Sequence, residues 1–168
     1  MRRRLFICGA VAPALTGCGF ALRRTGDYPF KTLLAGFSVT SPLGAELSRQ
    51  LRGTGRIELL TEAKQAPQAD VILDILQEQR QRVVVGLNAS GQVRELQLRM
   101  TVKFRLRNPD GLEWIEPVEV YQQRDLSYNE TAALSKEAEE AMLYRDMQND
   151  IVQQIMRRLA RVKPPVTR

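Results

Sequence analysis

Residues 96–106 alternate strictly between apolar and polar side chains, and this pattern constrains the fold more than any other in the chain. The apolar positions are Leu96, Leu98, Met100, Val102, Phe104 and Leu106. The polar positions are Gln97, Arg99, Thr101, Lys103 and Arg105. A β-strand directs successive side chains to opposite faces, whereas a helix does not. The segment therefore predicts a strand with one face on a core and the other in water, as antiparallel sheets allow.

Turn-forming residues on both sides of this strand predict two hairpins. The clusters are 88–91 (NASG) and 108–111 (NPDG). Residues 69–87 precede the first turn and predict a long strand, although a helix is the alternative for the polar middle, 77–82. Residues 113–126 follow the second turn and predict the returning strand. These segments together predict an antiparallel meander.

The remaining strand signals are weaker. Residues 30–39 predict a part-buried first strand, residues 57–60 are a candidate short strand, and 61–68 indicate a loop. Pro117 within the returning strand indicates an edge position or a bulge, because proline cannot donate a ladder hydrogen bond. Trp114 is available as a large core or interface residue.

A short helix begins at Ser41-Pro42. Serine accepts hydrogen bonds from the first helical turn, and proline loses no needed donor at the first helical position. One apolar stripe follows at intervals of four residues: Leu43, Leu47 and Leu51. Gly53 and Gly55 end the helix. The sequence predicts about three turns.

A long helix occupies the C-terminal part of the chain and runs to about Val162. Its predicted apolar face has nine members: Leu134, Ala138, Ala141, Tyr144, Met147, Ile151, Ile155, Leu159 and Val162. Ser127 or Asn129 is the candidate N-cap, and Pro164-Pro165 stops the helix. The predicted fold class is therefore α+β, a two-layer sandwich with both helices on one face of a four-stranded, mostly antiparallel sheet.

The other face of this sheet carries Arg99, Lys103 and Arg105, about 6.6 Å apart for every two residues. Such a cationic track is suited to phosphates or carboxylates, and a solvated outer face is the equally good alternative. No arrangement of residues predicts catalysis, so the protein is not expected to be an enzyme. Histidine is absent, which excludes zinc sites with histidine ligands and histidine-based triads.

The N-terminus has the three parts of an export signal. A basic start, 1–4, precedes an apolar run, 5–15, which is too short to span a membrane. Leu15-Thr16-Gly17-Cys18 resembles a bacterial lipobox, which implies a lipid on the Cys18 thiol and cleavage before it. Gly19 at the next position favours the outer membrane. A buried N-terminal helix with an incidental cysteine is the alternative.

The expected domain organisation follows. Residues 1–17 are a removed signal peptide, 18–29 a lipidated N-terminus and linker, 30–162 one α+β domain, and 163–168 a disordered tail. Removal of the signal leaves 151 residues, one cysteine and a net charge of +3, because three of the 25 basic residues are lost and 19 acidic residues remain. That charge suits anionic lipid or phosphorylated glycolipid and does not call for nucleic acid. No cofactor is expected beyond the covalent lipid on Cys18.

Several segments carry a further resemblance in the same order along the chain: 18–23 (CGFALR), 90–95 (SGQVRE), 124–129 (RDLSYN), 133–140 (ALSKEAEE), 147–152 (MQNDIV) and 157–159 (RRL). Together they resemble the LPS-assembly lipoprotein family, LptE. The resemblance implies an outer-membrane lipoprotein that plugs the lumen of a large β-barrel, LptD, as a heterodimer. The pair places lipopolysaccharide in the outer leaflet.

The resemblance also implies direct binding of lipopolysaccharide through basic residues. Lys136 matches one basic position of the family. A second falls near 88–90, where no cation stands, and Arg94 is the nearest substitute. Arg99, Lys103 and Arg105 are then candidates for contact with the polar barrel lumen. The alternative function is a periplasmic lipid-binding carrier, anchored to the outer membrane without a barrel.

Overall fold

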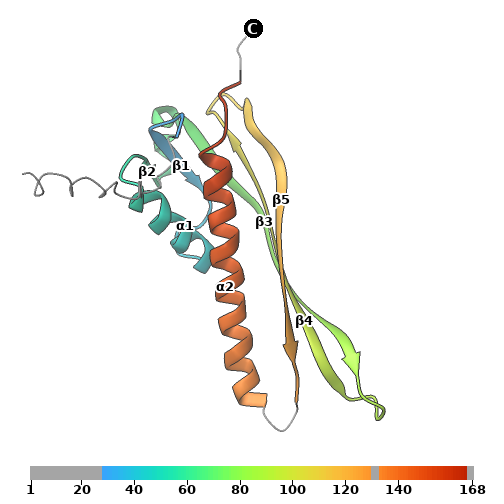
Figure 1. Ribbon diagram of the computed structural model, residues 1–168. Coiled ribbons are helices and arrows are strands. Elements are labelled where there is room, and N and C mark those ends of the chain that lie inside the picture. Colours follow the sequence, from blue (N-terminus) through green and yellow to red (C-terminus); the bar gives the residue numbers. More distant parts are fainter. Residues whose placement is uncertain (1–27, 130–132, 166–168) are drawn as a thin grey trace, which may run out of the picture.

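The computed structural model describes residues 28–129 and 133–165. Figure 1 shows their arrangement. The five strands are β1 (Thr32–Gly36), β2 (Glu58–Leu60), β3 (Val71–Leu87), β4 (Val93–Arg107) and β5 (Glu113–Ser127). The helices are α1 (Pro42–Gly53), the 3-10 helix η1 (Ala63–Gln68) and α2 (Ala133–Leu159).

All five strands form one mixed sheet in the order β2-β1-β3-β4-β5. The long strands β3, β4 and β5 form the predicted antiparallel meander. β1 runs parallel to both of its neighbours, β2 and β3, because α1 and η1 return the chain to the same end of the sheet between these strands. The predicted strand count of four is therefore one too low, since the short candidate strand pairs with β1.

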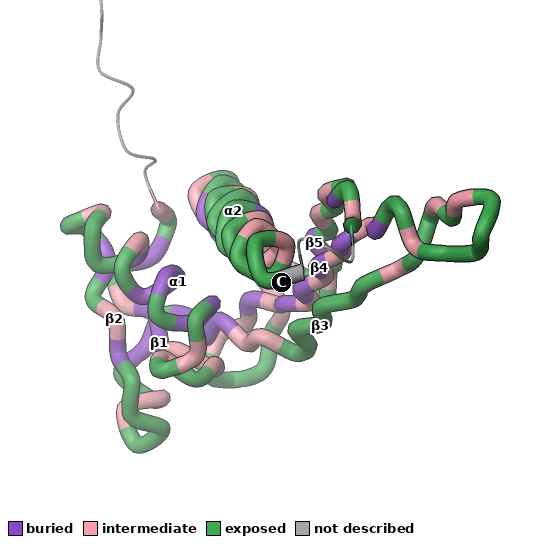
Figure 2. Tube along the Cα trace, turned by 90° about the horizontal axis from the view of Figure 1, so that it is seen from below, coloured by how far each residue is buried: buried purple, intermediate pink, exposed green. Residues whose placement is uncertain are grey.

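Both predicted helices pack on one face of the sheet, and the main core lies between the two layers (Figure 2). On β4, all six apolar positions of the alternating segment are buried, and five of them are 0% exposed. They meet a stripe from α1 and the C-terminal half of α2. The prediction of a one-sided strand is confirmed.

A smaller apolar cluster lies on the opposite sheet face. It consists of Leu34, Leu60, Ala69 and Ile72, with Ala66 of η1 packed against it. The segment expected to be a loop thus forms a short helix and covers apolar side chains that β1, β2 and β3 direct away from the main core.

β3 is a continuous strand, and the alternative of a helix in its polar middle is wrong. Its pairing with β4 extends through that middle, for example from Glu78 opposite Val102 to Arg82 opposite Leu98. Register shifts occur at either end of this stretch, between Ile75 and Gln77 and again near Gly86. Such bulges bend a strand and increase its twist. The end of the β3–β4 hairpin accordingly bends away from α2 in Figure 1.

The predicted role of Pro117 is confirmed twice. β5 is an edge strand, and its register against β4 shifts where Val118 pairs with Phe104 and Ile115 with Leu106. Proline thus stands where no ladder donor is needed. Trp114, at the start of β5, is partly buried and meets Phe30 edge-on, with ring centroids 6.4 Å apart.

α1 begins as its sequence predicts. Ser41 is the N-cap, and its Oγ accepts a hydrogen bond of 3.0 Å from Gly44 N. Pro42 occupies the first helical position. At the other end the helix stops at Gly53. Gly55 has a φ of 63°, a left-handed backbone conformation that residues other than glycine rarely adopt.

α2 buries its predicted apolar face only in its C-terminal half, where Met147, Ile151, Ile155 and Leu159 are 0% exposed. Near its start Leu134 is 84% exposed. Among the described residues no other helix flanks this part of α2, and the hairpin beside it diverges (Figure 1). Ser127 lies in β5 and is not a helix cap, whereas 130–132, which join Asn129 to α2, lie outside the described residues.

The connection into β3 contains a carboxylate that holds β1 in place. Asp70 accepts hydrogen bonds from Lys31 N at 2.8 Å and from Thr32 N at 2.9 Å. These bonds, the Thr32 bond foremost, hold the pKa of Asp70 below its usual value of 3.8. A carboxylate with a lowered folded pKa stabilises the fold above the unfolded value, and this contribution is lost as the pH falls through the folded pKa.

Asp70→Ala should therefore lower the free energy of unfolding at pH 7 by about 1–2 kcal/mol. The difference from the unmodified protein should shrink below pH 3.8, where the carboxylate takes up its proton. Urea unfolding between pH 7 and pH 2.5 measures both effects. Asp146→Ala, at an exposed carboxylate without an ion pair among the described residues, is the control. A difference that stays constant with pH would contradict the prediction.

Candidate functional site

Lys136 lies at the junction between β5 and α2. Its Nζ donates to Ser127 Oγ at 3.1 Å and to Glu139 Oε2 at 2.8 Å, and its side chain is 18% exposed. One neutral hydroxyl and one carboxylate hold the ammonium group, which carries three donors. The lysine is therefore positioned by the fold and keeps donor capacity toward solvent.

The structure brings Arg94 to the same end of the sheet. The Arg94 carbonyl oxygen accepts a hydrogen bond of 2.8 Å from Tyr128 N, and the next residue, Glu95, pairs with Ser127. Arg94 is exposed, and its guanidinium makes no hydrogen bond or ion pair with the described residues. Two predicted binding residues that lie far apart in sequence are thus at the same end of the sheet, near the β5–α2 junction.

The predicted cationic track on the open face of the sheet is partly neutralised. Arg105 Nε donates to Asp74 Oδ2 at 2.8 Å, and Arg105 Nη1 lies 3.5 Å from Glu113 Oε1. The Asp74 carboxylate also accepts from Arg107 at 2.7 Å. The Asp74 hydrogen bond is the main cause that raises the pKa of Arg105. The guanidinium at this end of the track is thus occupied by its neighbours.

The rest of this face is polar and only weakly cationic. Arg99 Nε donates to Gln97 Oε1 at 2.8 Å, and Lys103 stands in register between Gln77 and Glu119. Other members of the face are Gln79, Gln81, Thr101, Tyr121, Gln123 and Asp125. The arrangement favours contact with a polar surface over capture of one strongly charged group.

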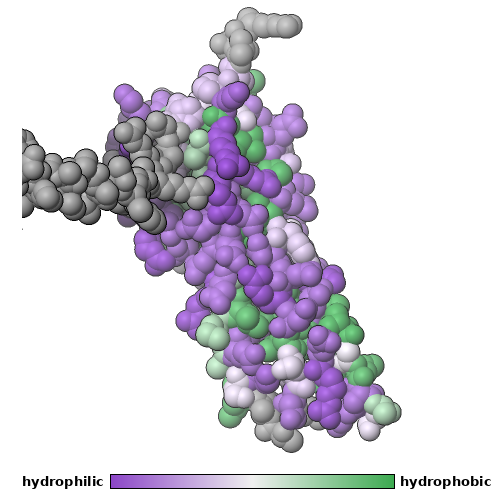
Figure 3. Space-filling model, viewed as in Figure 1, coloured by the Kyte–Doolittle hydropathy of each residue, from purple (hydrophilic) through white to green (hydrophobic). Residues whose placement is uncertain are grey.

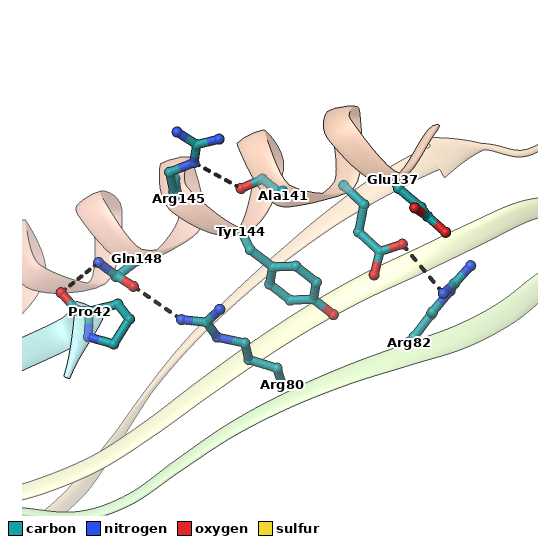
Figure 4. A pocket seen from close by; sticks show the side chains of 9 residues that line it. Pro42, Arg80, Arg82, Glu137, Ala141, Tyr144, Arg145 and Gln148 are labelled. Carbon is teal, nitrogen blue, oxygen red and sulfur yellow. Dashed lines mark hydrogen bonds and ion pairs between the residues drawn. The ribbon is translucent and has the colours of Figure 1, made fainter. Parts of the chain in front are cut away.

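A groove of about 580 Å³ lies on the other face of the sheet, between β3 and α2 (Figure 4). Its floor carries Arg80 and Arg82, and its wall is formed by Glu140, Tyr144 and Gln148 of α2, among others. The two arginines pair in register with Met100 and Leu98, so they point to the helix side of the sheet. α1 begins at one end of the groove and does not cover this floor.

Hydrogen bonds fix the groove wall. Tyr144 Oη donates to Gln81 O at 2.8 Å, and Gln148 Nε2 donates to Pro42 O at 3.0 Å. The guanidinium carbon of Arg80 lies 5.5 Å from the centre of the Tyr144 ring. Desolvation raises the pKa of Tyr144, and Glu140 adds to the rise. The tyrosine therefore stays neutral at physiological pH.

Sequence reasoning missed both groove arginines. The signal was the period-two pattern itself, which continues from buried Val71 and Leu73 into the polar middle of β3. The face of the two arginines could not be predicted for two reasons. The bulge after Ile75 shifts the alternation by one residue, and a bend or a helix was the competing interpretation of this segment.

Exposed apolar side chains gather near the end of the β3–β4 hairpin. Val84, Val85 and Leu87 are 49%, 47% and 61% exposed. Figure 3 shows hydrophobic side chains over this lower end of the molecule, while most of the visible surface is hydrophilic. A patch of this kind next to cations suits an amphiphilic contact.

Neither a metal-binding cluster nor a membrane-spanning helix occurs in the described residues. No group of three or more metal-binding side chains comes together in residues 28–129 and 133–165. Across the same ranges, no helix combines the length and the apolar character needed to cross a bilayer. Cys18 and the signal segment lie outside the described residues.

Comparison with known proteins gives consistent matches. A family model for lipopolysaccharide assembly, LptE, matches residues 30–159. The LPS-assembly lipoprotein LptE of Pectobacterium atrosepticum is 30% identical over 162 residues, which cover 95% of this chain and 86% of that protein. Its namesake from Yersinia pestis is 30% identical over 165 residues, with coverages of 96% and 78%.

Solved structures agree with the fold. An NMR structure of an uncharacterized lipoprotein B from Nitrosomonas europaea superposes with a TM-score of 0.71 at 31% identity, covering 84% of this chain and 90% of that one. The rare lipoprotein B from Shewanella oneidensis has a TM-score of 0.65 at 21% identity, with coverages of 77% and 94%, and supports the fold alone.

Proposed function

This chain belongs to the lipopolysaccharide-assembly family LptE, and from that premise we propose that it is an outer-membrane lipoprotein that assists insertion of lipopolysaccharide into the outer leaflet. The observation that carries the proposal is the family match over residues 30–159. Sequence similarity to curated family members along nearly the whole chain supports it. Assembly of this kind needs binding and placement rather than catalysis.

The proposed partner is the LptD β-barrel, whose lumen this domain plugs as the smaller member of a heterodimer. Large barrel lumens are polar, so a plug must present polar side chains outward. The open face of the sheet has that character, and its contact candidates are Arg99, Lys103 and Arg105. Arg105 would contact the barrel while it stays in ion pairs with Asp74 and Glu113. Lys103 makes no ion pair with the described residues.

The proposed contacts to lipopolysaccharide are Lys136 and Arg94. Both are cations at the β5–α2 junction, and the phosphates and sugar carboxylates of lipopolysaccharide are anions that lysine and arginine recognise through charge-assisted hydrogen bonds. Ser127 and Glu139 position the Lys136 ammonium, while the Arg94 guanidinium is exposed. The junction therefore offers one held and one free cation.

Lys136→Glu combined with Arg94→Glu should weaken capture of lipopolysaccharide by roughly tenfold or more, since each lost charge-assisted contact contributes ~1.5–3 kcal/mol. Pull-down with immobilised lipopolysaccharide measures this. The matched control is Lys64→Glu with Arg157→Glu, which makes the same charge change at exposed sites far from the junction. Undiminished capture by the junction variant would refute these contacts.

The partner is tested on the lipid-anchored protein extracted from membranes in mild detergent. We expect a very large outer-membrane β-barrel to co-purify, identified by mass. A monomer with bound lipid and no barrel would instead support the alternative, a periplasmic carrier. The β3–α2 groove does not suit a carrier, because it is open and its lining is mainly charged or polar.

The proposal also assigns the ends of the chain. Residues 1–17 serve as a removed signal, 18–29 as the lipidated N-terminus and linker, and 30–162 as one domain facing the periplasm and barrel lumen. Residues 163–168 form a tail beyond α2. The family match begins at residue 30 and stops at 159, which supports these limits.

A further inference from the structure

β3 directs two arginines toward the helix layer. The residues opposite them on the neighbouring strand β4 are buried and apolar. Arg80 stands opposite Met100, and Arg82 stands opposite Leu98. Both partners are 0% exposed. Pro42 is the one α1 residue that lines the groove, and the other wall residues come from α2, so the arginines lie on the floor of an open groove.

The fold holds these guanidiniums in place without using most of their donors. A guanidinium has five N–H donors. Among the described residues, only Arg80 Nη2 makes hydrogen bonds, to Gln148 of the groove at 3.1 Å and to Glu78 at 3.3 Å, which is also an ion pair. Gln148 is 7% exposed and is itself anchored to the carbonyl oxygen of Pro42. The position of Arg80 is thus fixed by a buried side chain.

Tyrosine rings flank both arginines. The guanidinium carbon of Arg80 lies 5.5 Å from the Tyr144 ring centre, and that of Arg82 lies 5.9 Å from the Tyr128 ring centre. A guanidinium near an aromatic ring keeps its N–H edges available in its own plane. Preorganised donors of this kind lose little conformational freedom when they bind.

The spacing of the two arginines suits one tetrahedral anion. Residues two apart on one strand face lie about 6.6 Å from each other, and a phosphate group is wide enough to accept hydrogen bonds from both guanidiniums at ~2.8 Å each. Arg105 and Arg107, which are spaced in the same way on β4, both donate to one Asp74 oxygen, so this spacing lets two arginines share one anion.

We propose that Arg80 and Arg82 form a phosphomonoester-binding site in the β3–α2 groove, separate from the junction of Lys136 and Arg94. This site depends on the proposed function in one respect only, which is that the natural source of the phosphate is a glycolipid headgroup. Val84 follows Arg82 by two residues and pairs with buried Leu96, so this exposed apolar side chain stands on the same face of β3, on the side where the acyl part of such a ligand would lie.

Glu140 acts in this site as an internal competitor. Its Oε2 lies 3.6 Å from Arg82 Nη1, an ion pair too long for a good hydrogen bond. An arriving phosphate takes the place of this carboxylate beside Arg82. Removal of the Glu140 charge should therefore strengthen phosphate binding, an effect that a purely structural salt bridge would not produce.

The test uses the full lipid-anchored chain in detergent at low ionic strength, with inorganic phosphate as the first probe and purified lipopolysaccharide as the second. Calorimetry gives the phosphate affinity, and the arginine Nε–H resonances in NMR spectra locate the site. Arg80→Gln with Arg82→Gln should weaken phosphate binding by about tenfold, and Glu140→Gln should strengthen it by roughly threefold or more. Lys64→Gln with Arg157→Gln, which removes the same charge elsewhere, should change it less than about twofold.

Each outcome decides the proposal. Equal weakening by the control pair, no gain from Glu140→Gln, or no phosphate shift at the Arg80 and Arg82 resonances would overturn it. If the double arginine variant unfolds, the resonances of the unmodified chain and the Glu140→Gln affinity still give the answer. Displacement of phosphate by lipopolysaccharide identifies a lipid headgroup, and phosphate binding without such competition identifies free phosphate esters. Barrel co-purification and the junction variants test the proposed function separately.

Discussion

Cys18→Ala should abolish incorporation of labelled fatty acid into the protein. The Cys18 thiol is the predicted acceptor of the diacylglyceryl group, and the cleaved chain has no other cysteine. Each buried CH₂ of an acyl chain contributes ~0.8 kcal/mol to membrane binding, so loss of the lipid removes the main anchor. Labelling of cells with radioactive palmitate, followed by capture of the protein, measures the effect directly.

Cys8→Ala is the matched control, since Cys8 lies within the predicted signal segment. It should leave the labelling unchanged. A labelled Cys18→Ala protein would contradict the assignment. The folded domain should still reach a barrel partner in the unlabelled variant, because its proposed contacts lie on the sheet and the strand–helix junction. In the proposed arrangement the lipid anchor determines the location, and the folded domain carries the proposed binding surfaces.

Phe104→Ala should cost the largest amount of stability of any single substitution considered, about 3–5 kcal/mol. Phe104 is 0% exposed and is a large, fully buried side chain of the main core. Truncation leaves a cavity between β4 and the helix layer, where Arg158 of α2 also lies 5.9 Å from the ring centre. Urea unfolding of the two proteins at pH 7 measures the loss.

Lys103→Ala is the control, because it changes the preceding residue on the opposite face of the same strand. Its cost should stay within roughly 0.5 kcal/mol, as for most surface sites. Comparable costs for Phe104→Ala and Lys103→Ala would show that the two faces of β4 do not differ as the structure describes. A large difference with an unchanged denaturant slope is the expected pattern.

Signals of short range predicted much of this fold. The β4 alternation, the Ser41 cap, the glycine at 55 and the edge position of Pro117 each depend on a few consecutive residues and on backbone stereochemistry. Such features depend on the local sequence and not on which other segments the chain packs against. The predicted α+β class and the two faces of β4 follow from them.

Pairings of long range were harder to predict. The parallel position of β1 between β2 and β3 depends on two crossover connections, and no local pattern distinguishes it from an antiparallel one. The neutralisation of Arg105 is similar, because Asp74 comes from another strand and Glu113 from a third. A pattern of cations along one strand does not reveal the acidic side chains that neighbouring strands place beside them.

The candidate sites show the same division. Lys136 and Arg94 were chosen by resemblance, and only the junction of β5 with α2 brings them to one end of the sheet. Arg80 and Arg82 were visible as charges within a strand, but the bulge after Ile75 decides which face they take. The groove around them depends on the position of α1, whose first residue, Pro42, lines it.

Sequence alone was sufficient for the strand with two unlike faces, the two helices and the family, since each of these depends on short runs of residues. The tertiary structure decided which charges are paired, which apolar residues remain exposed, and where a groove stays open. Those properties arise from contacts between segments that are distant in the chain. Their energies depend on distance and solvent exposure, which no run of residues specifies.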